Sequence, residues 1–303
     1  MAGSARRRLI AGFLTLLLAA WVIPAAVASH QVLHPDRQPH PDAAGLGDPV
    51  RIAGEGDVAL AGRWHPVAKA LGTVILLHGY GRDKTQMLPA AHFLHLARMN
   101  TLAYDARAHG ESGGTMTTVG ALEARDLVKV LDWLADKGVH QNVGAFGYSM
   151  GAATAVLAAA QDPRLSAVAI EGCYSSLNAL LGVAFPVFFH LPSFPYAPLA
   201  VRFTEWQAHI SAADLRPVDA ITRLGNRPVF IIGGMADRIA TPGQTLDLAH
   251  SALHSQLWLI PAARHVEGFD TAPAEYTRRL TTFFQTALTS SLASGWPQIA
   301  LSP

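Results

Sequence analysis

The sequence predicts an α/β fold with a mostly parallel central β-sheet and helices on both faces. Short apolar runs alternate with longer segments of helical periodicity from about residue 50 onward. Several of these runs lack the polar alternation of a strand with one wet face, as expected for strands buried on both sides. The chain of 303 residues is 50% hydrophobic and only 15% charged, which suits a large buried core and excludes a largely disordered chain.

The strands and helices alternate in a regular order. Residues 73–77 form a compact β-branched and aliphatic run, typical of a buried strand. Apolar residues recur on one helical face between residues 119 and 134, and residues 150–160 are rich in alanine. The expected strands are residues 58–65, 73–77, 101–104, 142–146, 167–170, 229–232 and 257–260. The expected helices are residues 87–99, 119–134, 150–160, 244–253 and 274–288.

The N-terminus has the pattern of an export signal. Arginines at 6–8 precede an apolar run, and residues 26–28 (Ala-Val-Ala) form a small-x-small cleavage pattern before Ser29. The alternative is an uncleaved anchor, because residues 9–28 would span about 30 Å as a helix, enough to cross a hydrocarbon core. We therefore interpret residues 1–28 as a signal peptide or membrane anchor, and the small residues favour cleavage. The domain is then periplasmic or extracellular, or anchored outside the cytoplasm.

The remaining chain divides into a linker and one domain. Residues 29–49 are rich in proline and polar residues and are expected to be a linker, and residues 50–303 hold the α/β domain. The 23 basic residues balance 22 acidic ones, so the sequence predicts no nucleic-acid partner. The single cysteine, Cys173, excludes an internal disulfide and a cysteine-rich metal framework.

A G-x-S-x-G motif at residues 147–151 (Gly-Tyr-Ser-Met-Gly) makes Ser149 the candidate nucleophile. An apolar run leads into the motif and a small-residue helix leads out of it, the strand-turn-helix context of a nucleophile elbow. Glycines on either side let the strand and the helix approach, and the sharp turn exposes the hydroxyl. The helix N-terminus also directs the backbone N–H of Met150 toward a reacting oxygen, which makes this group a candidate oxyanion donor.

These residues resemble the α/β-hydrolase superfamily, in particular its single-domain serine esterase and lipase-like members of the serine aminopeptidase S33 type. The resemblance covers about residues 55–288 and implies a chain order of oxyanion loop, nucleophile, acid and histidine. Residues 78–81 (His-Gly-Tyr-Gly) look like the family's H-G-x loop, which implies that the backbone N–H of Tyr80 is the second oxyanion donor. Residues 105–112 resemble a D-x-R-G-H-G-x-S stretch, with Ala108 in place of the usual glycine.

The acid and the base of the implied triad follow later expected strands. Asp237 comes just after the strand at 229–232, at the carboxyl end where such sheets gather functional side chains. Glu171 follows the preceding strand and is the alternative acid, because some relatives take the acid from that position. His265 lies on the loop after the last expected strand, where this family keeps its general base.

An apolar segment separates the strand ending near residue 170 from the next. Residues 174–201 contain no Asp, Glu, Lys or Arg, and prolines interrupt the segment. We interpret about residues 174–215 as a small cap insertion over the catalytic mouth, which would suit a hydrophobic acyl chain or alcohol. The alternatives are that these residues only complete the core, or that they contact a membrane surface, as would fit an anchored protein.

The sequence thus predicts a serine hydrolase that cleaves a carboxylic ester through a covalent acyl-enzyme. Ser149 would attack the carbonyl, His265 would move the proton and Asp237 would orient His265. The partner is a small-molecule ester-type substrate, no metal or organic cofactor is required, and an anchor would add membrane association through residues 9–28. An acyltransferase, thioesterase or peptidase would use the same triad, and a catalytically silent binding protein of this fold is the alternative of another class.

Overall fold

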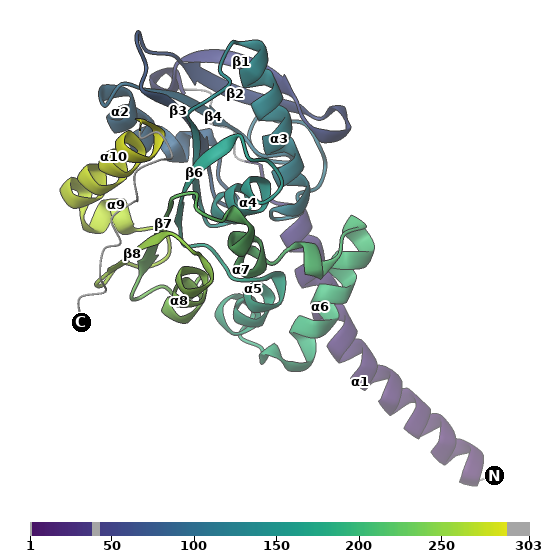
Figure 1. The fold of residues 1–303 in the computed structure, drawn as a ribbon. Coiled ribbons are helices and arrows are strands. Elements are labelled where there is room, and N and C mark those ends of the chain that lie inside the picture. Colours follow the sequence, from purple (N-terminus) through teal and green to yellow (C-terminus); the bar gives the residue numbers. More distant parts are fainter. Residues whose placement is uncertain (1, 38–42, 290–303) are drawn as a thin grey trace.

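The structure, a computed structural model, describes residues 2–37 and 43–289 (Figure 1). Within these residues an eight-stranded sheet has the order β1-β2-β4-β3-β5-β6-β7-β8. Strand β2 pairs antiparallel with both of its neighbours, and all the later pairs are parallel. The strands are β1 (Asp48–Ala53), β2 (Ala59–His65), β3 (Gly72–Leu77), β4 (Met99–Tyr104), β5 (Val143–Tyr148), β6 (Leu165–Glu171), β7 (Val229–Gly234) and β8 (Ser255–Ile260).

Helices cover both faces of the sheet, as the sequence predicts. Helices α2 and α10 lie on one side, and α3 and α4 lie on the other (Figure 1). The longer helices of the domain are α2 (Leu88–Leu96), α3 (Ala121–Asp136), α4 (Met150–Ala159), α8 (Pro242–Ser251) and α10 (Pro273–Thr289). The short elements are η1 (Ala44–Leu46), η2 (Glu55–Asp57), η3 (Lys84–Met87), η5 (Ala212–Asp214), α7 (Pro217–Ala220), η6 (Ile221–Leu224) and α9 (Gly268–Thr271).

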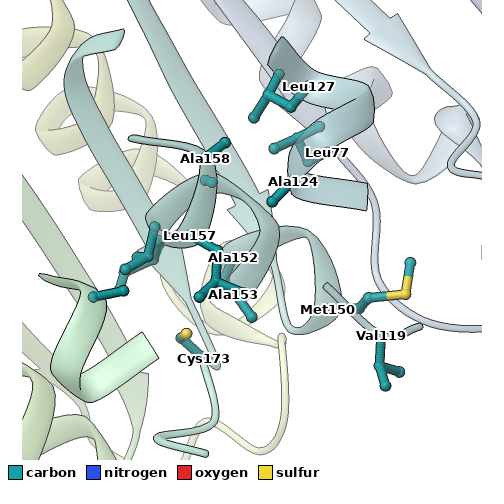
Figure 2. Close-up of a cluster of buried hydrophobic side chains, with 14 of the residues drawn as sticks. Leu77, Val119, Ala124, Leu127, Met150, Ala152, Ala153, Leu157, Ala158 and Cys173 are labelled. Carbon is teal, nitrogen blue, oxygen red and sulfur yellow. The ribbon is translucent and has the colours of Figure 1, made fainter. Parts of the chain in front are cut away.

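Helix α4 is the central helix of the fold, and every one of its residues is buried. Figure 2 shows its alanines and Leu157 between Leu77 at the end of β3, Ala124 and Leu127 of α3, and Cys173 after β6. A helix that is apolar on all sides suits such a position, and alanine lets neighbouring elements approach closely. This packing fixes the N-terminus of α4, where the G-x-S-x-G turn lies.

A second group of helices is inserted between β6 and β7. It consists of α5 (Leu177–Ala184), η4 (Phe185–Phe189) and α6 (Ser193–Ala208), which together occupy most of the segment expected to form a cap. Ser176 caps α5 by accepting a hydrogen bond from the amide of Ala179. The C-terminal part of the N-terminal helix α1 (Ala2–Leu33) packs against α6.

The structure differs from the expected linker at both of its ends. Helix α1 continues through the expected cleavage position to Leu33, and β1 begins at Asp48. Leu33 and Leu46 are fully or almost fully buried, so the segment contributes apolar surface that its proline content conceals. Strand β1 lies at the edge of the sheet, where Pro49 is tolerated because one side of an edge strand needs no N–H donor. Residues 38–42 of the expected linker lie outside the described residues.

Candidate active site

Ser149 lies in the sharp turn between β5 and α4. Its backbone has φ 51° and ψ −110°, a conformation that costs a non-glycine residue roughly 1–3 kcal/mol. The flanking glycines are required, because a Cβ on Gly147 would lie 2.2 Å from the carbonyl oxygen of Gly151. A Cβ on Gly151 would lie 2.4 Å from the carbonyl oxygen of Leu77. Close packing of β3, β5 and α4 therefore holds the strained serine in place.

The structure brings Ser149, Asp237 and His265 together. His265 Nε2 lies 2.9 Å from Ser149 Oγ, and His265 Nδ1 lies 2.7 Å from Asp237 Oδ2. Because a carboxylate only accepts hydrogen bonds, Nδ1 carries the proton and Nε2 is free to accept the serine hydroxyl. The three side chains come from the loops after β5, β7 and β8, at the carboxyl ends of parallel strands.

The carboxylate of Asp237 is buried and firmly oriented. Its Oδ1 accepts hydrogen bonds from the amides of Ile239 at 2.7 Å and Ala240 at 3.0 Å, which leaves Oδ2 for His265. The two loops are joined by a backbone hydrogen bond of 2.9 Å from Ala236 N–H to the carbonyl oxygen of Ala263. The acid and the histidine are therefore fixed relative to one another by backbone as well as by side chains.

Glu171, the alternative acid, bonds elsewhere. Its Oε1 accepts a hydrogen bond of 2.8 Å from the amide of Gly268, and its Oε2 accepts one from the hydroxyl of Tyr276. Burial raises the pKa of Glu171 to about 7. The carboxyl group thus lies behind the loop that carries His265 and secures it to α10, whereas Asp237 occupies the position next to the imidazole.

The H-G-x loop lies directly against the nucleophile. A Cβ on Gly79 would lie 3.6 Å from Ser149 Cβ, which places this part of the loop beside the nucleophile. His78 supports this loop, because its Nδ1 donates to the carbonyl oxygen of Gly79 at 2.7 Å and its Nε2 accepts from Ala106 N–H at 2.9 Å. Burial lowers the pKa of His78 to about 4, so the ring is neutral and both nitrogens are engaged.

The amide of Met150 lies in the first turn of α4. The first N–H groups of a helix have no intrahelical partner and carry the positive end of the helix dipole. Met150 directly follows Ser149 at the start of α4, so its amide, like that of Tyr80, stays a predicted donor to a negatively charged oxygen on a substrate.

The stretch at residues 105–112 packs against the H-G-x loop and the turn that follows it. Asp105 is fully buried and accepts hydrogen bonds of 2.7 Å from both the amide and the ammonium group of Lys84. Arg107 forms a bidentate pair with Asp126 of α3, with both bonds at 2.7 Å. Ala108 has φ 59°, the left-handed conformation that explains why glycine is usual at this position in the family motif.

Ser149 and His265 open into a cavity of about 780 Å³. Elements α5 and η4 contribute apolar walls, among them Leu181, Phe188 and Phe189. Helix α1 contributes Ala28, Gln31 and Val32. This second wall was not predicted, although Val32 and Leu33 continue the apolar pattern of α1 past the cleavage motif.

Among the residues that the structure describes, no group of three or more His, Cys, Asp or Glu side chains is arranged to hold a metal ion. The histidines at 65 and 95 stack with ring centroids 3.6 Å apart.

Comparison with known proteins gives the same fold. Residues 68–191 match the family described as Serine aminopeptidase, S33. The uncharacterized protein YqkD of Bacillus subtilis is 32% identical over 168 residues, which make up 54% of this chain and 55% of that protein. The match thus spans only about half the length of this curated relative.

Solved structures match over more of the chain. The Pyrococcus furiosus esterase Pf2001 is 27% identical and superimposes with a TM-score of 0.69, over 84% of this chain and 99% of that one. An esterase from Thermogutta terrifontis superimposes with a TM-score of 0.60 at 18% identity, over 80% of this chain and 100% of that one, a likeness of fold. With the strand order, the serine turn and these matches in agreement, the chain has the α/β-hydrolase fold.

Proposed function

We propose that this chain is a serine hydrolase that cleaves a carboxylic ester of an apolar acid or alcohol. The observation that carries the proposal is the hydrogen-bonded series Ser149, His265 and Asp237, which opens into an apolar cavity. The likeness to the Pyrococcus furiosus esterase supports ester chemistry. The apolar side chains that the cap places around the cavity support a hydrophobic acyl or alcohol group.

The reaction follows from the protonation states in the site. Ser149 Oγ attacks the ester carbonyl carbon while His265 Nε2 takes the hydroxyl proton, and Asp237 stabilises the imidazolium that forms. The amides of Tyr80 and Met150 hold the negative oxygen of the tetrahedral intermediate. His265 returns the proton to the departing alcohol, which leaves an acyl group on Ser149. A water molecule, deprotonated by His265, then attacks the acyl carbon; the bond to Ser149 Oγ breaks, His265 returns the proton to Oγ, and the acid leaves.

The nucleophile is tested with a fluorophosphonate probe, which phosphonylates an activated serine. We expect the wild-type chain to be labelled and Ser149→Ala to be unlabelled, because the probe needs the hydroxyl that His265 activates. Ser251→Ala, a serine at the end of α8, is the matched control and should label like the wild type. Equal labelling of Ser149→Ala and the wild type would exclude Ser149 as the nucleophile.

The acid is tested by comparing Asp237→Asn with Glu171→Gln on p-nitrophenyl butyrate. Asp237→Asn should lower kcat by about three to four orders of magnitude, because an amide favours the wrong imidazole tautomer. Glu171→Gln keeps a hydrogen-bond acceptor for Gly268 and should lose far less. The reverse ranking would transfer the acid role to Glu171.

The preference for an ester over an amide is tested on the wild-type chain with a p-nitroanilide that has the same acyl group. Faster turnover of the anilide than of the ester would indicate a peptidase.

A further inference from the structure

The C-terminal third of α1 is built into the domain. Ala25, Ala28, Ser29 and Leu33 are fully buried, although they flank the position where a signal peptide would be cut. Figure 1 shows the N-terminal half of the helix projecting away from the domain, while its other half passes beside α6. A helix that served only as a leader would have no reason to bury these side chains.

Polar contacts join the same turns of α1 to both sides of the cavity. On the cap side, Ser29 Oγ accepts a hydrogen bond of 2.9 Å from Gln207 Nε2 and lies 3.1 Å from Thr204 Oγ1, both on α6. On the opposite side, the hydroxyl of Tyr80 donates to the carbonyl oxygen of Gln31. The helix thereby connects the cap with the loop that carries the proposed oxyanion donor.

The turns of α1 that line the cavity are continuous with the exposed, apolar N-terminal half of the same helix. Ala28, Gln31 and Val32 line the cavity that contains Ser149. The window of α1 that could span a membrane has a mean hydropathy of 2.3 and is 6% buried. From residue 9 to residue 27 the helix measures about 28 Å, which matches a hydrocarbon core. Large exposed apolar side chains also occur on the cap, namely Phe188, Phe194 and Trp206.

We propose that α1 is retained as a membrane anchor, that its last turns are a wall of the substrate cavity, and that the cavity takes an amphiphilic ester with a long apolar chain from the bilayer. This inference rests on the proposed ester hydrolysis. If residues 9–27 fill the hydrocarbon core, Gln31 lies about 6 Å beyond it, at the depth where ester groups of lipids meet water. The arginines at 6–8 would remain on the cytoplasmic side.

Two features of the arrangement favour this class of substrate. The exposed Phe188 lines the same cavity as Ala28 and Val32 of the anchor helix, so an apolar chain can pass from lipid into the cavity with little contact with water. Cleavage after Ala28 would instead place a new ammonium group at Ser29, whose side chain is buried against α6. An unpaired charge in such a place is costly, which favours the intact helix.

The wall is tested with the full chain in detergent, using p-nitrophenyl dodecanoate and butyrate. Gln31 is exposed toward the cavity, so Gln31→Trp should fold normally and narrow the cavity. We expect kcat/KM to fall by about tenfold or more for dodecanoate and by less than about twofold for butyrate. Val27→Trp, one turn earlier on the outward surface of the same helix, is the control and should change neither value.

If Gln31→Trp leaves the ratio of the two kcat/KM values unchanged, with or without an equal loss on both esters, Gln31 does not form a wall of the substrate cavity. If butyrate hydrolysis in the wild type does not depend on Ser149, the proposed function itself fails instead. The two failures are therefore distinguishable.

Retention and the source of the substrate need two further measurements. The intact mass of the chain from the membrane fraction should include residues 6–28. A soluble chain that begins at Ser29 would contradict the anchor.

The source of the substrate is tested in vesicles that contain the full chain and a long-chain monoacylglycerol. Diluting this ester with inert phosphatidylcholine, at constant bulk ester concentration, should lower the rate of hydrolysis in proportion. A rate that follows only the bulk concentration would show that the ester comes from water.

Discussion

Glu171 is a carboxyl group in a position where a charge is unfavourable. It is 2% exposed, and burial raises its pKa from 4.5 to about 7. Its oxygens accept from the amide of Gly268 and the hydroxyl of Tyr276, so it joins β6 to the loop after His265 and to α10. The role that follows is to hold the histidine loop.

The raised pKa makes stability depend on pH. Because the folded state binds the Glu171 proton more tightly than the unfolded state, this stabilisation is complete below about pH 4.5 and is lost as pH rises through about 7. Glu171→Gln removes the titration. In urea unfolding between pH 4 and 8, the wild-type free energy of unfolding should fall relative to that of the variant by about 3 kcal/mol. A constant difference between the two proteins would show that folding does not raise the pKa of Glu171.

Single residues also show how far the site could be predicted from the sequence. Ser149, Asp237 and His265 could be chosen because each follows an apolar strand in the chain order that the family resemblance implies. The contact of Glu171 with Tyr276 joins residues 105 apart, and no local pattern indicates it. The same holds for Gln31, whose place in the cavity wall depends on how a distant helix packs.

Among the elements, the turn from β5 into α4 is the most tightly constrained. A Cβ on Gly147 would lie 2.2 Å from backbone, whereas nothing lies within 4 Å of a Cβ on Gly182 in α5. Gly147→Ala should therefore lower the free energy of unfolding by about 3 kcal/mol or more, and should also disturb Ser149. Gly182→Ala should raise it by about 0.5–1 kcal/mol, because alanine favours a helix. Chemical denaturation of both variants checks the pair, and similar values would contradict the close packing.

Helices and strands could be predicted from the sequence where the hydrophobic pattern alone determines the secondary structure. The expected strands at 73–77 and 229–232 lie within β3 and β7, because both are buried on each face. Strand β1 was not predicted, since Pro49 and the charged Arg51 give it the composition of a loop. Its strand conformation comes from pairing with β2, a tertiary contact that local propensity does not contain.

For the molecule as a whole, the buried contact between α1 and α6 decides how the N-terminal helix is attached. Ser29→Ala removes the partner of Gln207 and Thr204 and should lower the free energy of unfolding of the full chain by about 1–2 kcal/mol. Thr15→Ala is the control, because Thr15 bonds only within the exposed part of the helix. Thermal unfolding of the Ser29→Ala and Thr15→Ala variants is compared in detergent. Equal melting temperatures would mean that α1 does not pack against α6 in solution.

The hydrogen bond between Ser149 and His265 joins residues 116 positions apart, and the histidine comes after the last strand of the sheet. During synthesis the serine turn leaves the ribosome well before β8 and its loop. The nascent chain therefore holds a hydroxyl that nothing yet deprotonates. In the proposed mechanism, reactivity arises only when the C-terminal region has folded onto the rest, so an incomplete translation product would leave esters uncleaved.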